Sequence, residues 1–122
     1  MIDHMTLRVK DFARSKAFFA AALEPLGYAL VMEFEGFAGL GVKGKPDFWI
    51  AAAEHRQYDQ VHIAFRALDR KAVHAFYDAA MKAGGKDNGG PGTREHYHPD
   101  YYGAFVLDLD GHNIEACCHD PA

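Results

Sequence analysis

The sequence has little cysteine, no run of basic residues and no long hydrophobic stretch. Its two cysteines, Cys117 and Cys118, are adjacent, and neighbouring residues of a strand point to opposite faces of a sheet. The disulfide framework that stabilises many small secreted domains is therefore excluded. The lack of a basic block, with a formal net charge of −4, argues against a nucleic acid or an anionic membrane as a partner.

No apolar stretch approaches the roughly 20 residues that a membrane-spanning helix needs. The first residues, MIDHMTLRVKDF, lack the hydrophobic region of a signal peptide, so we expect a cytoplasmic protein. The chain has 122 residues, of which 49% are hydrophobic and 25% are charged, as in an average globular domain. This composition and length predict one folded domain, 1–122.

The sequence contains an internal repeat with an offset of 58 residues. Residues 4–27, HMTLRVKDFARSKAFFAAALEPLG, align with residues 62–85, HIAFRALDRKAVHAFYDAAMKAGG, and eight of the 24 positions are identical. Two copies are too few for a solenoid, which needs at least three repeats. The repeat therefore predicts two similar units packed side by side, at about 1–54 and about 60–122.

Each copy predicts the same succession of a strand, a helix and two or three further strands. Asp11 and Asp69 occupy the expected N-cap positions of the helices, which Gly27 and Gly84–Gly85 end. A polar linker and a long Gly/Pro-rich segment separate the predicted elements. The strands are predicted at 4–9, 28–34, 37–43, 47–53, 62–67, 102–108 and 113–118, the helices at 12–23 and 70–83, the linker at 54–60 and the Gly/Pro-rich segment at 84–100.

Three potential metal ligands share the polar side of the predicted strands. His4 and His62 hold equivalent positions in the two copies, on the face opposite to the apolar residues that must pack on the helices. If Ile114 faces the helices, Glu115 points to the same side as the two histidines. Two histidines and one carboxylate form a known facial arrangement for a divalent metal, which leaves positions open for substrate. The pattern predicts a site for Fe, Mn, Zn or Ni.

Residues 86–102, a Gly-rich segment that leads into the sixth predicted strand, carry a second group of chemically active residues. A long loop with such side chains is typical of an active-site lid or a substrate wall. Its histidines and tyrosines can exchange protons, and its arginine can bind a carboxylate or a phosphate. The candidates for proton transfer are Tyr97, His98, Tyr101 and Tyr102, and the candidate for substrate binding is Arg94.

Taken together, these residues resemble the vicinal oxygen chelate superfamily, which includes glyoxalase I, extradiol dioxygenases, fosfomycin-resistance enzymes and bleomycin-resistance proteins. The segments that carry the resemblance are HMTLRVKDFARSKAFF, VHIAF and DLDGHNIEA. The resemblance implies an α+β fold of two tandem βαβββ modules, which form a cupped, eight-stranded mixed sheet around a metal ion. It says little about the reaction, because the superfamily supports several chemistries.

By this resemblance, His4, His62 and Glu115 match the metal ligands of the first, fifth and eighth strands. Glyoxalase I has a further glutamate on its fourth strand, where this sequence has Trp49, and Asp47 is a poor substitute two residues away on the same predicted face. Arg8 matches an arginine that contacts the glutathione carboxylate in glyoxalase I. Arg8 and Trp49 are therefore candidates for substrate binding, together with Arg94.

The leading hypothesis is a divalent-metal enzyme, glyoxalase-like or dioxygenase-like, that chelates a small oxygenated substrate and stabilises an oxyanion. Two alternatives stay open. The first is a metal-free protein of the bleomycin-resistance type, which sequesters an apolar or aromatic ligand. The second is a thiol transferase of the fosfomycin-resistance type. The resemblance also makes a homodimer plausible.

Overall fold

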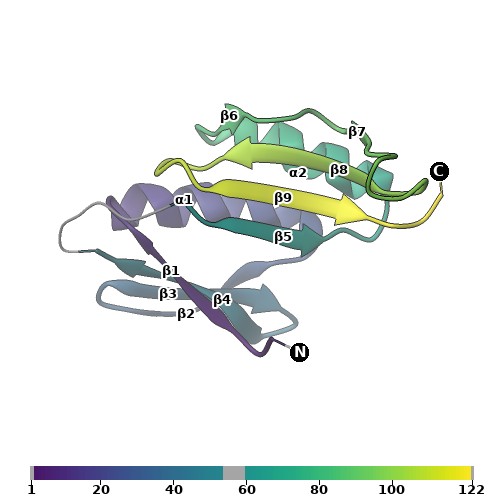
Figure 1. The fold of residues 1–122 in the computed structure, drawn as a ribbon. Coiled ribbons are helices and arrows are strands. Elements are labelled where there is room, and N and C mark those ends of the chain that lie inside the picture. The colour runs from purple at the N-terminus through teal and green to yellow at the C-terminus, as the bar shows by residue number, and fades with distance from the viewer. Residues whose placement is uncertain (1, 54–59, 122) are drawn as a thin grey trace.

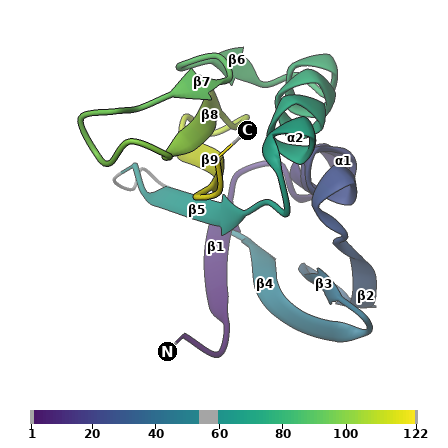
Figure 2. The same ribbon diagram turned by 90° about the vertical axis from the view of Figure 1, so that its right-hand side faces the viewer.

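The chain folds into two β-sheets that are covered on one side by a pair of helices (Figure 1). The computed structural model describes residues 2–53 and 60–121. We call residues 2–53 the N-terminal unit and residues 60–121 the C-terminal unit. Figure 2 shows the two helices next to each other on the same side of the molecule. The opposite faces of both sheets, which we call the outer faces, carry no helix in the described residues.

The N-terminal unit is a four-stranded sheet with one helix. Its strand order is β1-β4-β3-β2, and the edge strand β1 is parallel to its neighbour β4. A short 3-10 helix, Glu24–Leu26, follows α1 and ends at Gly27, whose φ of +92° suits glycine. The elements are β1 (Met5–Val9), α1 (Phe12–Leu23), β2 (Ala29–Phe34), β3 (Phe37–Val42) and β4 (Lys45–Ala52).

The C-terminal unit repeats this plan with a longer insertion before its last two strands. Its strand order is β5-β9-β8-β6, β7 also pairs with β8, and β5 and β9 are parallel like β1 and β4. The elements are β5 (His62–Arg66), α2 (Arg70–Lys82), β6 (Lys86–Asp87), β7 (Gly92–Thr93), β8 (Tyr102–Leu107) and β9 (Asn113–Cys118).

The helices begin where the sequence predicts, because both N-cap aspartates accept a backbone hydrogen bond. The Asp11 carboxylate accepts from the Arg14 N–H at 3.1 Å, and the Asp69 carboxylate accepts from the Ala72 N–H at 2.8 Å. The first helix ends at Leu23 as predicted, and the second ends one residue early, at Lys82. The main strands lie within two residues of their predicted ends. The predicted linker, 54–60, lies outside the described residues except for Gln60.

Two strands escaped prediction within the Gly/Pro-rich segment. Each contains two residues: β6 pairs with the end of β8, and β7 pairs with its start. A pair of residues cannot show the alternation that identifies a strand in a sequence. These short strands attach the segment to the edge of the second sheet, and they fix the two ends of the loop that they border.

Aromatic rings join the two units beneath the sheets. Phe48 of β4 lies 5.0 Å from Phe19 of α1 and 5.3 Å from Phe65 of β5, measured between ring centroids. Tyr28 also packs edge-on against Phe65, at 5.4 Å. Burial of aromatic side chains is a dominant stabilising contribution in a domain of this size. The units therefore share one hydrophobic core. In the described residues, neither helix is long and apolar enough to cross a membrane.

Candidate functional site

A histidine and a buried glutamate meet on the outer face of the second sheet. The parallel register pairs Ala64 with Glu115, which places the Glu115 side chain next to that of His62. His62 Nε2 lies 3.0 Å from Glu115 Oε1, and the His62 side chain is 48% exposed, whereas that of Glu115 is 2% exposed. A carboxylate at such depth requires partners, since burying an unpaired charge is costly. His62 is one of these partners.

The second partner of Glu115 is Tyr101, which precedes β8. Its hydroxyl donates a hydrogen bond to Glu115 Oε2, so both carboxylate oxygens are engaged. Burial and the adjacent carboxylate raise the pKa of Tyr101 above its usual value, and the phenol therefore keeps its proton near neutral pH. Gly103 makes this contact possible, because a Cβ there would lie 3.1 Å from Glu115 Oε2 and 3.3 Å from the Tyr101 ring.

Phe105 and Arg94 form the wall beside this pair. Phe105 is the direct cross-strand neighbour of Glu115, and its ring stacks on that of His62 with 6.1 Å between centroids. The guanidinium carbon of Arg94 lies 5.2 Å from the Phe105 centroid, and its Nη2 donates to the Gly90 carbonyl at 2.9 Å. The guanidinium is thus held by an aromatic ring and carbonyl oxygens, an arrangement that can also accommodate an anion.

The outer face of the first sheet carries His4 and Trp49 in place of such a pair. They line a hollow of about 360 Å³ together with Thr6, Phe37 and Pro46. The indole of Trp49 lies against the backbone of Gly39, where a Cβ would come within 2.9 Å of the ring. Arg8 extends from the same face of β1 as Thr6 and is exposed. This face is therefore aromatic and open.

The strand registers show that Trp49 and Glu115 occupy equivalent positions. Thr6 pairs with Trp49 in the first unit, and Ala64 pairs with Glu115 in the second. Thr6 and Ala64 are 58 residues apart, which is the offset of the repeat. The structure thus supports the alignment made from the sequence, and the glutamate expected on the fourth strand of glyoxalase I is a tryptophan in this chain.

The three predicted metal ligands do not gather within the chain. His62 and Glu115 are in contact, whereas His4 Nδ1 contacts only the neighbouring Asp3 carboxylate, at 2.8 Å, among its recorded polar contacts. Across residues 2–53 and 60–121, no group of three histidine, cysteine, aspartate or glutamate side chains is arranged to hold a metal. Two of the three predicted ligands are therefore together, and the third lies on the other sheet.

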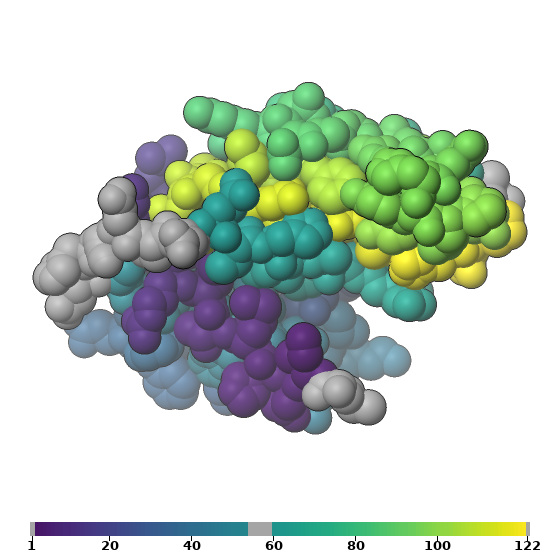
Figure 3. Space-filling model, in the orientation of Figure 1, coloured from purple at the N-terminus to yellow at the C-terminus, as the bar shows by residue number. Residues whose placement is uncertain are grey.

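The loop before β8, residues 94–101, brings three of the four predicted proton-transfer residues into one cluster. Tyr97, which is 55% exposed, packs edge-on against Tyr101 at 4.8 Å, and His98 packs against the same ring at 5.4 Å. The sequence did not single out His119, whose Nδ1 lies 2.9 Å from His98 Nε2. Figure 3 shows this loop projecting at one end of the second sheet, against the C-terminal residues.

Tyr102 lies apart from this cluster. Adjacent residues of a strand point to opposite faces, so the ring of Tyr102, the first residue of β8, faces α2 while Tyr101 reaches Glu115. Its hydroxyl lies 2.6 Å from His74 Nε2, and the Arg70 guanidinium carbon lies 4.6 Å from its centroid. The structure therefore separates Tyr102 from the site and gives it a packing position on the helix.

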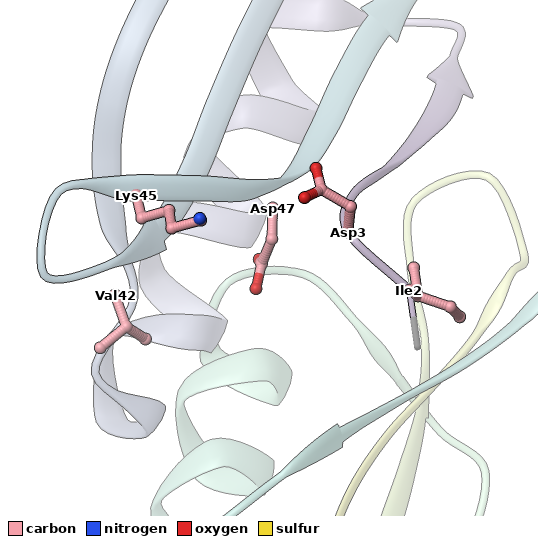
Figure 4. Close-up of a pocket in the computed structure, with 5 residues that line it drawn as sticks. All are labelled: Ile2, Asp3, Val42, Lys45 and Asp47. Atoms are coloured by element: carbon pink, nitrogen blue, oxygen red, sulfur yellow. The ribbon is translucent and has the colours of Figure 1, made fainter.

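A further hollow, of about 440 Å³, lies at the N-terminal end of β1 (Figure 4). Strand alternation from Trp49 predicts that the Asp47 side chain points to the outer face. In the structure, it approaches the Tyr28 hydroxyl instead. Burial and the Asp47 carboxylate raise the pKa of Tyr28. The register shift between Leu40 and Gly41 changes the alternation along β4 and accounts for the difference. Asp47 therefore belongs to this hollow rather than to the outer face.

These features define a class of protein: two βαβββ-like units, related by an internal repeat, with a histidine and a carboxylate on the outer face of the second. A sequence model of the glyoxalase/bleomycin resistance protein/dioxygenase superfamily matches residues 1–116. The chain belongs to this superfamily. Proteins of the superfamily commonly use divalent metals, and its members bind small-molecule ligands.

Solved structures support the same fold. A glyoxalase/bleomycin resistance protein from Albidiferax ferrireducens T118 is 25% identical, with a TM-score of 0.83, and the match covers 95% of this chain and 97% of that one. A family enzyme from Burkholderia phytofirmans PsJN is 17% identical, with a TM-score of 0.76 and 98% coverage of both chains. A lactoylglutathione lyase from Agrobacterium tumefaciens is 15% identical, with a TM-score of 0.69 and coverage of 97% and 92%. A search of curated proteins gave no significant match.

Proposed function

We propose that the chain is a divalent-metal enzyme, lactoylglutathione-lyase-like or extradiol-dioxygenase-like, that acts on a small oxygenated substrate. The observation that carries the proposal is the contact between His62 Nε2 and Glu115 Oε1 on the outer face of the second sheet. His62, Glu115 and His4 are the proposed ligands. When bound, the metal would supply Lewis-acid chemistry to chelated substrate oxygens.

The donor set fits such an ion in part. An imidazole nitrogen and a carboxylate oxygen are ligands that Zn, Ni, Fe and Mn all accept. Their convergence on one face, with the imidazole half exposed, leaves room for further ligands from solvent or substrate. His4 supplies the same kind of nitrogen donor on the other sheet, and it requires a rearrangement or a second chain to reach the pair.

The remaining residues orient the ligands and the substrate. Tyr101 keeps its proton on the phenol oxygen and holds Glu115 Oε2, which fixes the direction of Oε1. Arg94, which packs on the Phe105 ring, would bind an anionic group of the substrate, and Arg8 and Trp49 would contact the substrate from the first sheet. Tyr97 and His98 are the proposed proton donors and acceptors of the loop.

The proposal is tested by the metal content of the purified protein after it has been soaked in Fe, Mn, Ni or Zn and desalted. Mass spectrometry should find close to one equivalent in the parent protein and little in His62→Ala and Glu115→Ala. Glu33→Ala is the matched control, because Glu33 pairs with Lys16 on the helix side and should leave the metal content unchanged. Absence of retained metal in the parent would overturn the proposed function.

A homodimer would complete the site. The outer face of the first sheet exposes Met32, Phe34 and Phe37, with 60% of Phe34 accessible. In the described residues, β1 and β5 are edge strands that pair on one side only. Uncovered apolar faces and open edges favour association. A second copy that places its C-terminal unit against this face would bring His62 and Glu115 to the partner's His4.

A mixing experiment separates this arrangement from closure within one chain. The variants His4→Ala and Glu115→Ala each lack one ligand, so each alone should bind little metal. If the site is shared, mixed dimers regain one intact site, and the metal content rises after the two variants are unfolded and refolded together. If each chain supplies all its ligands, the mixture binds no more metal than the separate variants.

The outer face of the first sheet favours one second candidate, a metal-free binding protein that sequesters an aromatic ligand. The observation is the hollow lined by Trp49 and Phe37 next to His4. Trp49 is the sole tryptophan of the chain, so its fluorescence reports directly on this face. A shift of that fluorescence by aromatic compounds in the presence of EDTA would support the binding protein, and a ligand response that requires metal would support the enzyme.

A further inference from the structure

The residue that follows the last strand lies against the loop before β8. His119 is the first residue after β9, and its Nδ1 is 2.9 Å from Nε2 of His98. The two imidazole rings are stacked, with 5.1 Å between centroids and 28° between planes. This contact joins the C-terminal end of the second sheet to the middle of a loop that is otherwise held at its ends by the short pairing of β7 with β8.

The hydrogen-bonding pattern fixes the direction of this contact. The Asp100 N–H donates to His98 Nδ1 at 3.1 Å, so neutral His98 carries its hydrogen on Nε2. His98 Nε2–H then donates to His119 Nδ1, which must be the unprotonated nitrogen of that ring. His119 is therefore required as an acceptor, and an aliphatic or phenyl side chain cannot replace it.

Both rings of the histidine pair, His98 and His119, contact the ring of Tyr101. Tyr101 packs edge-on against His119 at 5.1 Å and against His98 at 5.4 Å, and its N–H donates to the His98 carbonyl at 3.1 Å. The hydroxyl at the other end of the same side chain donates to Glu115 Oε2. A continuous set of contacts thus runs from His119 through His98 and Tyr101 to the buried carboxylate.

We infer that His119 is a positioning residue: its hydrogen bond with His98 holds the Tyr101 phenol on Glu115 and thereby orients that carboxylate toward His62. The inference rests on the proposed function in so far as Glu115 is a metal ligand. The role belongs to the Nδ1 acceptor of His119, since the ring contact alone leaves His98 free to turn away from its donor position. His119 itself touches neither His62 nor Glu115 in the recorded contacts of the described residues.

The first test uses metal-free protein and therefore does not depend on the proposed function. Amide hydrogen exchange is followed at Arg94, Tyr97 and Tyr101, whose N–H groups are hydrogen-bonded within the loop. His119→Ala and His119→Phe should exchange roughly fivefold faster at these amides, because one hydrogen bond that closes the loop is lost. His119→Asn, whose side-chain oxygen can replace the Nδ1 acceptor, should restore slow exchange.

The matched control is Asp120→Ala, an exposed neighbour of His119 whose side chain lies outside the cluster. It should exchange like the parent. Equal exchange in His119→Ala, His119→Asn and the parent would overturn the inference, because the loop would then be held without the histidine pair. A change that His119→Phe rescues and His119→Asn does not would assign the effect to ring packing and would also overturn it.

The second test measures the affinity for Co²⁺ from its visible absorption. Tyr101→Phe should weaken binding about tenfold, as expected for a residue that orients a ligand, and His119→Ala about threefold. In the Tyr101→Phe background, His119→Ala should have no additional effect, since both act through the same hydrogen bond to Glu115. Additive effects would overturn the inference.

The stoichiometry of Co²⁺ distinguishes two further outcomes. A second equivalent that disappears in His119→Ala would overturn the positioning role, because the histidine pair would itself be a ligand site. No Co²⁺ binding in the parent would contradict the proposed function, and the hydrogen-exchange experiment would then decide the role of His119 alone.

Discussion

The two units share a strand register and differ in what they place on it. In the first unit, the cross-strand pair on the outer face is Trp49 on β4 with Gly39 on β3. In the second unit, the equivalent pair is Glu115 on β9 with Phe105 on β8. The aromatic ring of the pair is thus on β4 in the first unit and on β8 in the second. Glu115 on β9 holds the position that Trp49 holds on β4. The first unit presents an open aromatic face with a hollow, and the second presents a buried carboxylate beside an aromatic ring.

The units also differ in how their outer faces are covered. In the second unit, the loop between β7 and β8, residues 94–101, projects on the side away from the helices (Figure 2), and the Tyr101 hydroxyl donates a hydrogen bond to Glu115. The first unit has no equivalent insertion, since two residues join β2 to β3, and its outer face stays open. The same backbone plan can therefore carry a built polar site or an apolar contact surface, depending on a few outward-facing side chains and one loop.

The largest expected effect concerns the core that the units share. Phe48→Ala should lower the free energy of unfolding by about 3–5 kcal/mol, because the ring is buried between Phe19 and Phe65. As long as the chain is a monomer, Phe34→Ala, on the exposed outer face of the same unit, should change it by less than about 0.5 kcal/mol. Urea denaturation followed by Trp49 fluorescence measures both. A large loss for Phe34→Ala would show that the outer face is buried in solution.

The next effect tests whether the equivalent positions have different roles. Glu115→Gln should weaken Zn²⁺ binding by at least about 100-fold. Loss of a residue that only orients a metal ligand weakens binding by up to about 100-fold, and loss of a ligand itself should cost at least as much. Trp49→Phe should leave the affinity unchanged, because an indole is no metal ligand. Isothermal titration calorimetry gives both values. Equal losses in the two variants would contradict the assignment of the site to the second unit.

A smaller effect should be the same in both units. Asp11→Ala and Asp69→Ala each remove an N-cap hydrogen bond to the third residue of a helix, which costs about 1 kcal/mol. Thermal denaturation of the single and double variants should show similar and additive losses. A much larger loss in one unit would indicate that its helix contributes more to the shared core than the repeat suggests.

The smallest effect appears at alkaline pH. The pKa values of Tyr28 and Tyr101 are raised in the folded protein by burial and by Asp47 and Glu115, respectively. Their contribution to stability is complete below the unfolded value of about 10 and is lost as the pH rises through the folded values. At a pH between the unfolded and the folded pKa, the tyrosine hydroxyl loses its proton in the unfolded chain and keeps it in the folded protein. Urea unfolding should therefore show a steeper loss of stability above pH 10 in the parent than in Tyr28→Phe or Tyr101→Phe.

Much of this architecture follows from local pattern in the sequence. Alternation identified the strands that carry His62 and Glu115. Superposing the fourth predicted strand on the last one placed Trp49 at the position equivalent to Glu115, in agreement with the strand registers. Alternation also contains the information that separates Tyr101 from Tyr102, since adjacent residues point to opposite faces once the strand begins at Tyr102. The sequence does not fix the first residue of this strand, so it does not show that Tyr101 and Tyr102 point to opposite faces.

Other features depend on tertiary structure and leave no local signal. The separation of His4 from His62 is set by how two sheets pack, which strand periodicity does not encode. His119 follows a strand as an isolated histidine, and only the return of the loop to the end of β9 makes it a partner of His98. The direction of Asp47 depends on a register shift, which a regular alternation cannot anticipate.

The central claim is that His62 and Glu115 form the metal-binding half of the site. Anomalous diffraction from crystals soaked in Zn²⁺ tests it most directly, because the signal locates the ion among the side chains. We expect a peak about 2.0–2.2 Å from both His62 Nε2 and a Glu115 carboxylate oxygen, with His4 of the same or a second chain as a further ligand. A peak at His98 and His119 alone, or no peak near Glu115, would contradict it.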